Sequence, residues 1–212
     1  MLPQYRTVKE YTEHEIIIQK SRFICYVNRA QTEEEALAFI QMIKKKNWNA
    51  THNCSAYLIG ENDQIQKAHD DGEPSGTAGV PMLEVLKKKH LKDTVVVVTR
   101  YFGGIKLGGG GLIRAYGKSV SEGITAAGIV NRILMQVMNT KIDYTLLGKV
   151  ENDLRHSPYK LKEIHYVEDV IFETYVEETQ KQQFKEWMTE LTNGRVSIAE
   201  GNMLYLEEEI EN

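Results

Sequence analysis

One short segment of the chain concentrates an imidazole and three carboxylates. It reads His69-Asp70-Asp71-Gly72-Glu73, and it continues through Ser75, Gly76, Thr77 and Gly79 to Pro81, a composition typical of a loop. Carboxylates bind divalent cations, and an imidazole beside them can exchange protons with a substrate. The same carboxylates can instead accept hydrogen bonds from glycine N–H groups and so organise the loop. We expect the structural role, because adjacent acidic residues on a loop do not by themselves converge on one site.

A second segment combines glycines with cations. Six of the sixteen glycines lie within nine residues, at Gly103, Gly104, Gly108, Gly109, Gly110 and Gly111. Bare backbone N–H groups that lead into a helix form a site for anions. Four cations surround them, and two of these are four residues apart on the following helix and therefore share a face; the four are Arg100, Lys106, Arg114 and Lys118. We expect a surface that binds phosphate groups, with Tyr101 and Phe102 stacking on bases.

A structural alternative exists for this glycine-rich segment. A tight connection from strand to helix, with solvated cations and a buried Phe102, explains part of the composition but needs fewer glycines. Three better-known sites fail on spacing. Gly117-Lys118-Ser119 lacks the earlier glycine of a P-loop, no G-x-G-x-x-G fingerprint is present, and no pair of histidines or cysteines has zinc-site spacing. We therefore expect no cofactor, no metal and no assigned catalytic residue.

Four strands and three helices are expected to position these segments. The strands are 15–18, 22–27, 55–59 and 95–98, and the last consists of valines and reads as a central strand covered on both faces. Thr32 and Glu35 form the capping box of one helix. Pro81 suits the first position of a second helix, and a third follows the glycine loop from Leu112 to about residue 127. Gly117 and Gly123 inside the third helix predict close packing against the sheet.

The pattern changes near residue 130. Strands are expected at 135–144, 161–167, 170–176 and 196–206, with helices at 145–156 and around 184–191. The resulting order β-α-β-β-α-β is that of a ferredoxin-like domain. The sequence thus predicts an α+β protein with one domain at 1–130 and another at 131–212. Residues 1–130 hold 17 basic and 14 acidic residues and so carry a net charge of +3, against −4 for the whole chain. The first domain is therefore the better partner for a phosphate backbone.

Composition restricts the class of protein. Hydrophobic residues make up 42% of the chain, and no apolar run approaches the length of a membrane span. The first residues lack the apolar core of a signal peptide. With only two cysteines, Cys25 and Cys54, we expect free buried thiols and a reducing cytoplasm rather than a disulfide framework.

Two long motifs make the chain resemble the IMPACT family. They are Gly72-Glu73-Pro74-Ser75-Gly76-Thr77-Ala78-Gly79 with Pro81, and Val97-Val98-Thr99-Arg100-Tyr101-Phe102-Gly103-Gly104 through Gly111, followed by Arg114-Ala115-Tyr116. The resemblance covers about residues 15–127, and the remainder looks like the small C-terminal domain of bacterial members. It implies a first domain like domain 2 of ribosomal protein S5 and a second like the fifth domain of elongation factor G. It transfers no catalytic residues.

The family resemblance also bears on function. Eukaryotic members regulate translation under starvation stress, and both implied folds recur in proteins of translation, which is an argument by analogy. We expect a cytoplasmic, non-enzymatic regulator or accessory factor of translation that binds RNA, or a ribosome-associated partner, through the basic glycine-rich face. The alternative is an enzyme, for instance a metal-dependent hydrolase, that uses His69, Asp70, Asp71 and Glu73. A third class, an adaptor for other proteins, requires an exposed apolar patch. The sequence does not indicate an oligomeric state.

Overall fold

The computed structural model describes residues 1–210 of the chain. These residues form ten β-strands and five α-helices, which divide into two compact units. The N-terminal unit contains Tyr5–Asn131 and residues 209–210, and the C-terminal unit contains Met1–Gln4 and Arg132–Glu208. Residues 1–4 were expected in the first domain but group with the second, where the Leu134 N–H donates to the carbonyl oxygen of Pro3 at 2.8 Å. The predicted α+β class is confirmed.

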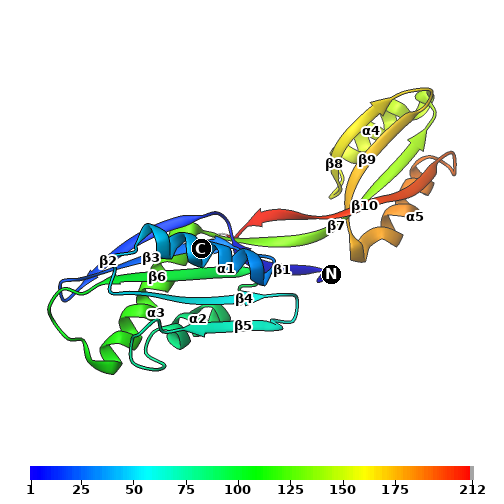
Figure 1. The fold of residues 1–212 in the computed structure, drawn as a ribbon. Helices are drawn as coiled ribbons and strands as arrows, with labels where there is room; N and C mark the ends of the chain where they lie inside the picture. Colours follow the sequence, from blue (N-terminus) through cyan, green and yellow to red (C-terminus); the bar gives the residue numbers. More distant parts are fainter. Residues whose placement is uncertain (211–212) are drawn as a thin grey trace. The chain divides into compact units, whose positions relative to one another are not determined.

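A five-stranded antiparallel sheet forms the centre of the N-terminal unit, in the order β2-β3-β6-β4-β5. Helix α1 covers one face of this sheet, and α2 and α3 cover the other (Figure 1). The strands are β2 (Thr12–Ile18), β3 (Ser21–Arg29), β4 (His52–Ile59), β5 (Ile65–His69) and β6 (Thr94–Tyr101); the helices are α1 (Glu33–Lys46), α2 (Gly79–Lys88) and α3 (Gly108–Ala127).

The central strand β6 has two buried faces, as predicted from its valines. Val96 and Val98 pack with α2 and α3, whereas Val95 and Val97 pack with α1. Side chains alternate along a strand, so the end of β6 sends consecutive residues to opposite sides. Arg100 therefore lies on the side of α2 and α3, and Tyr101 lies on the side of α1.

Both glycine-associated helices begin earlier than the sequence predicts. Helix α2 begins at Gly79, so Pro81 is its third residue rather than its first. This is tolerated because the first four N–H groups of a helix have no partner within the helix. Helix α3 begins at Gly108 rather than at Leu112, so four consecutive glycines form its first turn instead of a loop. Glycine disfavours a helix by about 1 kcal/mol per residue, which makes this turn costly.

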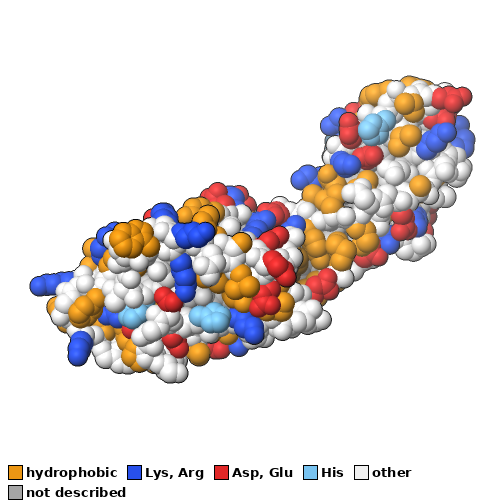
Figure 2. All heavy atoms as spheres, viewed as in Figure 1, with side chains coloured by type: hydrophobic (Ala, Val, Ile, Leu, Met, Phe, Trp, Pro, Cys, Tyr) orange, Lys and Arg blue, Asp and Glu red, His pale blue; other side chains and the backbone are white. Residues whose placement is uncertain are grey.

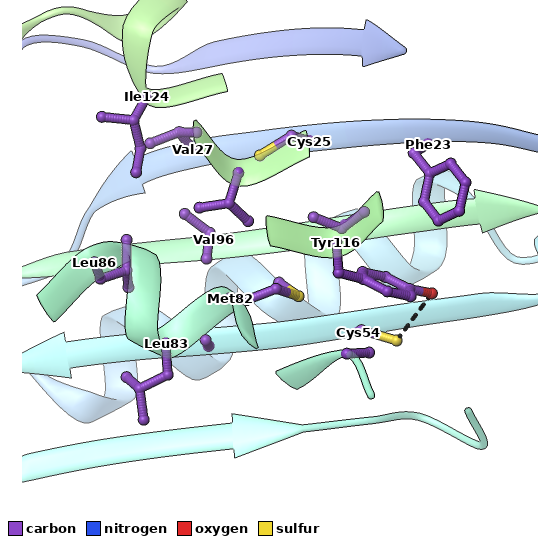
Figure 3. Close-up of a cluster of buried hydrophobic side chains, with 14 of the residues drawn as sticks. Phe23, Cys25, Val27, Cys54, Met82, Leu83, Leu86, Val96, Tyr116 and Ile124 are labelled. Carbon is purple, nitrogen blue, oxygen red and sulfur yellow. Dashed lines mark hydrogen bonds between the residues drawn. The ribbon is translucent and has the colours of Figure 1, made fainter. Parts of the chain in front are cut away.

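Helix α3 packs closely against the sheet at one of the two expected glycines. A Cβ atom on Gly123 would lie 2.6 Å from the Cys25 sulfur, so only glycine fits there. Gly117 differs from the prediction, because the neighbour nearest to such an atom is Val85 of α2 rather than a sheet residue. Figure 3 shows Tyr116 and Ile124 of α3 reaching into the core with the α2 side chains.

The C-terminal unit has the predicted ferredoxin-like order, with strands arranged β10-β7-β9-β8. Helices α4 and α5 supply buried side chains to its single core. Among the residues that the structure describes, no helix is both long enough and apolar enough to span a bilayer. The elements are β7 (Ile129–Ile142), α4 (Leu147–Arg155), β8 (Lys160–Tyr166), β9 (Val170–Glu177), α5 (Lys181–Leu191) and β10 (Ser197–Glu209), and β7 also pairs with β1 (Gln4–Val8).

Candidate functional site

The Asp70 carboxylate organises the acidic loop. Its oxygens accept hydrogen bonds from the backbone N–H groups of Gly76, Ala78 and Gly79 at 2.8 to 3.1 Å. Partial burial opposes ionisation of this carboxyl group, but the three donors outweigh burial and hold the pKa of Asp70 below its usual value. Gly79 is the first residue of helix α2, and Ala78 is its N-cap residue, which makes no side-chain hydrogen bond. Asp70 therefore caps α2 from a distance, which is the structural role that the sequence predicts.

Asp71 ties the same loop to its neighbours. One carboxylate oxygen accepts a hydrogen bond from the Asn53 N–H at 2.7 Å, and the other lies 2.7 Å from the Lys44 ammonium group. Burial again opposes ionisation, and these two partners nevertheless lower the pKa of Asp71. The carboxylate thus connects the loop to β4 and to the last turn of α1, where Lys44 also lies near the negative end of the helix dipole.

The remaining polar residues of the acidic loop do not join these carboxylates in one site. His69 and Ser75 are exposed, and the Thr77 hydroxyl donates to the carbonyl oxygen of Pro74 at 2.6 Å. Within residues 1–210, three ligand-type side chains approach the geometry of a metal site only in the C-terminal unit, at Glu163, His165 and Glu173. The convergence that the enzyme alternative requires of the loop is therefore not observed in the described part of the chain.

Glu73 forms a buried ion pair with Arg100. The Arg100 Nη1 donates to a Glu73 carboxylate oxygen at 2.6 Å, and the Tyr116 hydroxyl donates to the same oxygen at 2.8 Å. The side chains of Glu73 and Arg100 are only 3% and 6% exposed. Arg100 is thus not one of the exposed cations that the sequence analysis expects on the glycine-rich face. It connects the two sequence motifs inside the protein.

The Arg100 guanidinium lies between two aromatic rings. Its central carbon is 5.4 Å from the ring centroid of Phe23 and 5.5 Å from that of Phe102. Such contacts between a guanidinium and an aromatic face are favourable. The Arg100 Nε is buried and has no hydrogen-bond partner. Arg100 is therefore held rigidly, with one donor unused.

Of the two aromatic residues expected to stack on bases, only Phe102 lies at the glycine-rich segment. The Tyr101 hydroxyl donates to Asn47 at 3.0 Å, and the Arg22 guanidinium lies 5.3 Å from the centroid of its ring. These contacts place Tyr101 on the α1 side of the sheet, away from the glycine-rich segment, so it does not offer the expected stacking surface there. Phe102 is 47% exposed, as its expected stacking role requires and unlike the buried Phe102 of the structural alternative, and it lines the site.

The six glycines of the second segment serve different purposes. A Cβ atom on Gly103 would collide with the Lys20 backbone at 2.1 Å, and Gly104 and Gly108 have positive φ angles of 86° and 70°. Around Gly109 and Gly110, by contrast, a Cβ atom would meet no atom closer than 3.7 Å. A close contact or a positive φ angle thus explains the glycines at positions 103, 104 and 108. Neither explains Gly109 and Gly110, which are therefore available for another role.

Within residues 1–210, no side chain caps the first turn of α3. Its N-cap residue, Leu107, makes no side-chain hydrogen bond, and no acidic residue occurs in the turn Gly108–Gly111. The unpaired N–H groups and the helix dipole act together as about half a positive charge at this end. The turn is therefore suited to accept an anion from outside the chain.

A cavity of about 380 Å³ lies beside this turn, between the two sequence motifs. Glu73 and Pro74 line it from the acidic loop, and Arg100 and Phe102 line it from the end of β6 and beyond. The remaining wall residues are Thr51, His52, Lys106, Leu107, Gly108, Gly109 and Leu112. Glu73 and Arg100, which join the two motifs, are 27 residues apart in the sequence. The structure thus brings both motifs to one concave site.

His52 also lines this cavity, although no motif in the sequence points to it. Its Nδ1 lies 2.8 Å from the carbonyl oxygen of Asp71, so Nδ1 carries the proton and donates it. The other ring nitrogen, Nε2, lies 3.7 Å from a Glu73 oxygen. His52 stands directly opposite Arg100 in the pairing of β4 with β6. A strand predicted to begin at residue 52 and to pair with β6 would have revealed it.

Three of the expected cations remain exposed around the turn. Lys106, Arg114 and Lys118 are all exposed. Arg114 extends back toward the start of α3, with its Nη1 3.7 Å from the position of a Cβ atom on Gly110. Lys118 lies 3.6 Å from Glu122 in an exposed ion pair, which contributes little. In the view of Figure 2, basic and acidic side chains are interspersed over the N-terminal unit.

Both cysteines are free and buried, as expected. The Cys54 sulfur lies 2.9 Å from the carbonyl oxygen of Asp70 and 3.4 Å from the Tyr116 hydroxyl (Figure 3). Burial raises the pKa of Cys54 to about 12, and burial also raises that of Cys25. Neither thiol is poised to act as a nucleophile at neutral pH.

Comparison with known proteins agrees with this arrangement of motifs. The model of the Impact N-terminal domain matches residues 19–124, which contain both motifs and the cavity. The chain belongs to the IMPACT family. A second model, a domain of unknown function (DUF1949), matches residues 140–195 of the C-terminal unit.

The relatives of the chain include several bacterial members of this family. The chain is 70% identical over 210 residues to the IMPACT family member YvyE of Bacillus subtilis, covering 99% of this chain and 97% of that protein. It is 34% identical to the IMPACT family member YigZ of Escherichia coli, over 68% of this chain and 74% of that protein. A crystal structure of a hypothetical protein, 27% identical, superposes with a TM-score of 0.61 and covers 93% of this chain and 97% of the other.

Proposed function

We propose that the protein is an accessory factor of translation that binds RNA through phosphate contacts at the N-terminus of α3. The observation that carries this proposal is the first turn Gly108–Gly111, whose N–H groups have no side-chain cap and no acidic neighbour in the turn. Lys106 and Arg114 add exposed cations at the same place. Family membership supports the assignment to translation, since eukaryotic members act there.

The electrostatic balance of the site favours an anion. The Arg100 and Glu73 charges compensate each other in their buried pair. What remains at the cavity and on α3 is the positive helix end together with Lys106, Arg114 and the partly paired Lys118. Phosphate contacts from such groups position a nucleic acid without reading its sequence. The proposed binding to RNA is therefore independent of sequence and sensitive to salt, and we propose that it takes place in the cytoplasm.

The acidic loop supports binding rather than catalysis. Asp70 is occupied by three backbone donors, and Asp71 by Asn53 and Lys44. Both carboxylates therefore hold the loop in place. In this position of the loop, Glu73 and Pro74 line the cavity.

A salt titration with a matched control tests the proposal. A short unstructured RNA is titrated with the wild type and with the double variant Arg114→Ala/Lys118→Ala at several salt concentrations. Each phosphate contacted on a single strand contributes about 0.7 to the log–log slope, so the double variant should flatten the slope by about 0.7 to 1.4. The control Lys45→Ala/Lys67→Ala removes the same charge from exposed positions on other elements.

The expected result is a flatter slope for the α3 variant and an unchanged slope for the control. Equal slopes and affinities for wild type and α3 variant would remove this face from the mechanism. The adaptor alternative would then lead, because Phe102, Ile105 and Ile113 are large apolar side chains exposed in the same region.

A further inference from the structure

The cavity beside α3 contains more than the charges that a phosphate backbone needs. A surface that binds only phosphate groups needs no more than the N-terminus of α3 and the exposed cations around it. The structure adds a partly open cavity of about 380 Å³, lined by the buried Arg100 and by the half-exposed ring of Phe102. These features favour a ligand that has both an anionic group and an apolar part.

The donors of the cavity suit an anion with several free oxygens. Backbone N–H groups of Gly108 and Gly109 open the helix on one side, and the Lys106 ammonium group belongs to the adjoining wall. Arg100 is fixed by Glu73 and by two rings, so it lines the wall at no further cost in side-chain entropy. A terminal phosphate has three free oxygens, whereas a phosphate within a strand has two. The terminal group therefore matches a site with several separate donors better.

The remaining volume suits a flat ring. The cavity exceeds the space of one phosphate and falls within the range of small-molecule pockets, about 300 to 1,000 Å³. Its other walls are largely apolar, from Phe102, Pro74, Leu107 and Leu112. Bases stack on exposed aromatic rings irrespective of their sequence. A base attached to the bound phosphate would thus lie against Phe102.

We infer that this cavity binds a nucleoside monophosphate group, with its phosphate at the N-terminus of α3 and its base against Phe102. The inference deepens the proposed function and rests on it: the bound group is the phosphorylated end of an RNA strand. A free mononucleotide offers the same chemistry, and the experiment below separates the two sources.

Two RNAs that differ only at the 5′ end test the inference. Anisotropy of a short unstructured RNA labelled at its 3′ end is measured with the full chain, once with a 5′-phosphate and once with a 5′-hydroxyl. We expect about tenfold tighter binding of the 5′-phosphate form. The variants Lys106→Gln and Phe102→Ala should each reduce this preference to about twofold or less, because they remove one donor or the stacking surface. Lys45→Gln, on α1, should leave it unchanged.

Competition then identifies the source of the ligand. Adenosine 5′-monophosphate should displace the 5′-phosphate RNA, and adenosine should not. If the monophosphate binds in a Lys106-dependent way but neither RNA binds, the pocket is confirmed for free nucleotides and the proposed RNA function is wrong. Equal affinity for both RNAs, with a salt slope still dependent on Arg114 and Lys118, overturns the pocket and leaves the proposed function intact. No binding of any of these probes overturns both.

Discussion

Replacing Arg100 by Met should lower the free energy of unfolding of the N-terminal unit by about 3–5 kcal/mol, the usual cost of breaking a buried ion pair on one side. Methionine keeps apolar contact with Phe23 and Phe102, so little of this loss comes from packing. The loss arises at Glu73, whose side chain is 3% exposed. Its carboxylate would retain the hydrogen bond from Tyr116 and lose its ion pair.

A double-mutant cycle separates the pair from its surroundings. Glu73→Gln leaves the Arg100 guanidinium buried without its carboxylate, and Glu73→Gln/Arg100→Met removes both charges. The double variant should therefore be more stable than the sum of the single effects predicts, by about 1–3 kcal/mol. Lys44→Met is a matched control, since it breaks the half-exposed pair with Asp71 and should cost at most about 1 kcal/mol.

Amide hydrogen exchange is the suitable assay, because the chain has two units that need not unfold together. Strand β6 pairs on both edges, so its amides exchange only when the N-terminal unit opens, and they report its stability alone. A loss below about 1 kcal/mol for Arg100→Met, or strictly additive effects in the cycle, would refute the reasoning. The acidic loop would then be held to β6 by other contacts.

Three further predictions concern acid stability, thiols and the second unit. The pKa of Asp70 is lower in the folded state than its usual value of 3.8, so its stabilising effect is complete above about pH 4 and is lost as the pH falls through the folded pKa. The stability difference between wild type and Asp70→Asn should therefore shrink below about pH 4 in urea titrations; a constant difference would contradict this. Cys25 and Cys54 should react with a thiol reagent at pH 7 only after unfolding, since both are buried and protonated, and rapid labelling of the native protein would contradict this. Residues 131–212 alone should give a dispersed amide spectrum, because the described core residues of this unit, from Met138 to Met188, form a hydrophobic cluster of their own; a collapsed spectrum would count against it.

The positions of Arg100 and Tyr101 show which part of the site can be predicted from the sequence. The valine run predicts the central strand, but the prediction ended the strand at Val98. Extended to Tyr101, the same alternation would have placed Arg100 beside the buried Val98 and Tyr101 on the other side. A charged residue in that buried position requires a partner, and the partner is 27 residues away in sequence. Pairing over that separation has no local signal.

The sequence does not predict strands that lack a regular pattern of apolar residues, such as β1 and β5. Strands β1 and β5 have five residues each and include polar positions that face solvent, so neither shows a regular apolar pattern. The start of α3 was missed because glycine is a poor helix former, and four in a row indicate a loop. The βαββαβ order of the second unit was predicted correctly, because its elements alternate apolar and polar residues with clear periods. The local role of Asp70 also followed from neighbouring glycines.

The capping of α2 by Asp70 has a consequence for ligand selection. Two glycine-bearing helix ends lie on the same side of one sheet, and each attracts an anion. At α2 the anion is part of the chain, so its effective concentration is far above that of any dissolved competitor. Of these two helix ends, only that of α3 is left for the soluble phosphate group that we propose to bind there. The proposed site would therefore take one soluble anion for each N-terminal unit, and a carboxylate introduced near the start of α3, for example at Leu107, should occupy that helix end and abolish the binding.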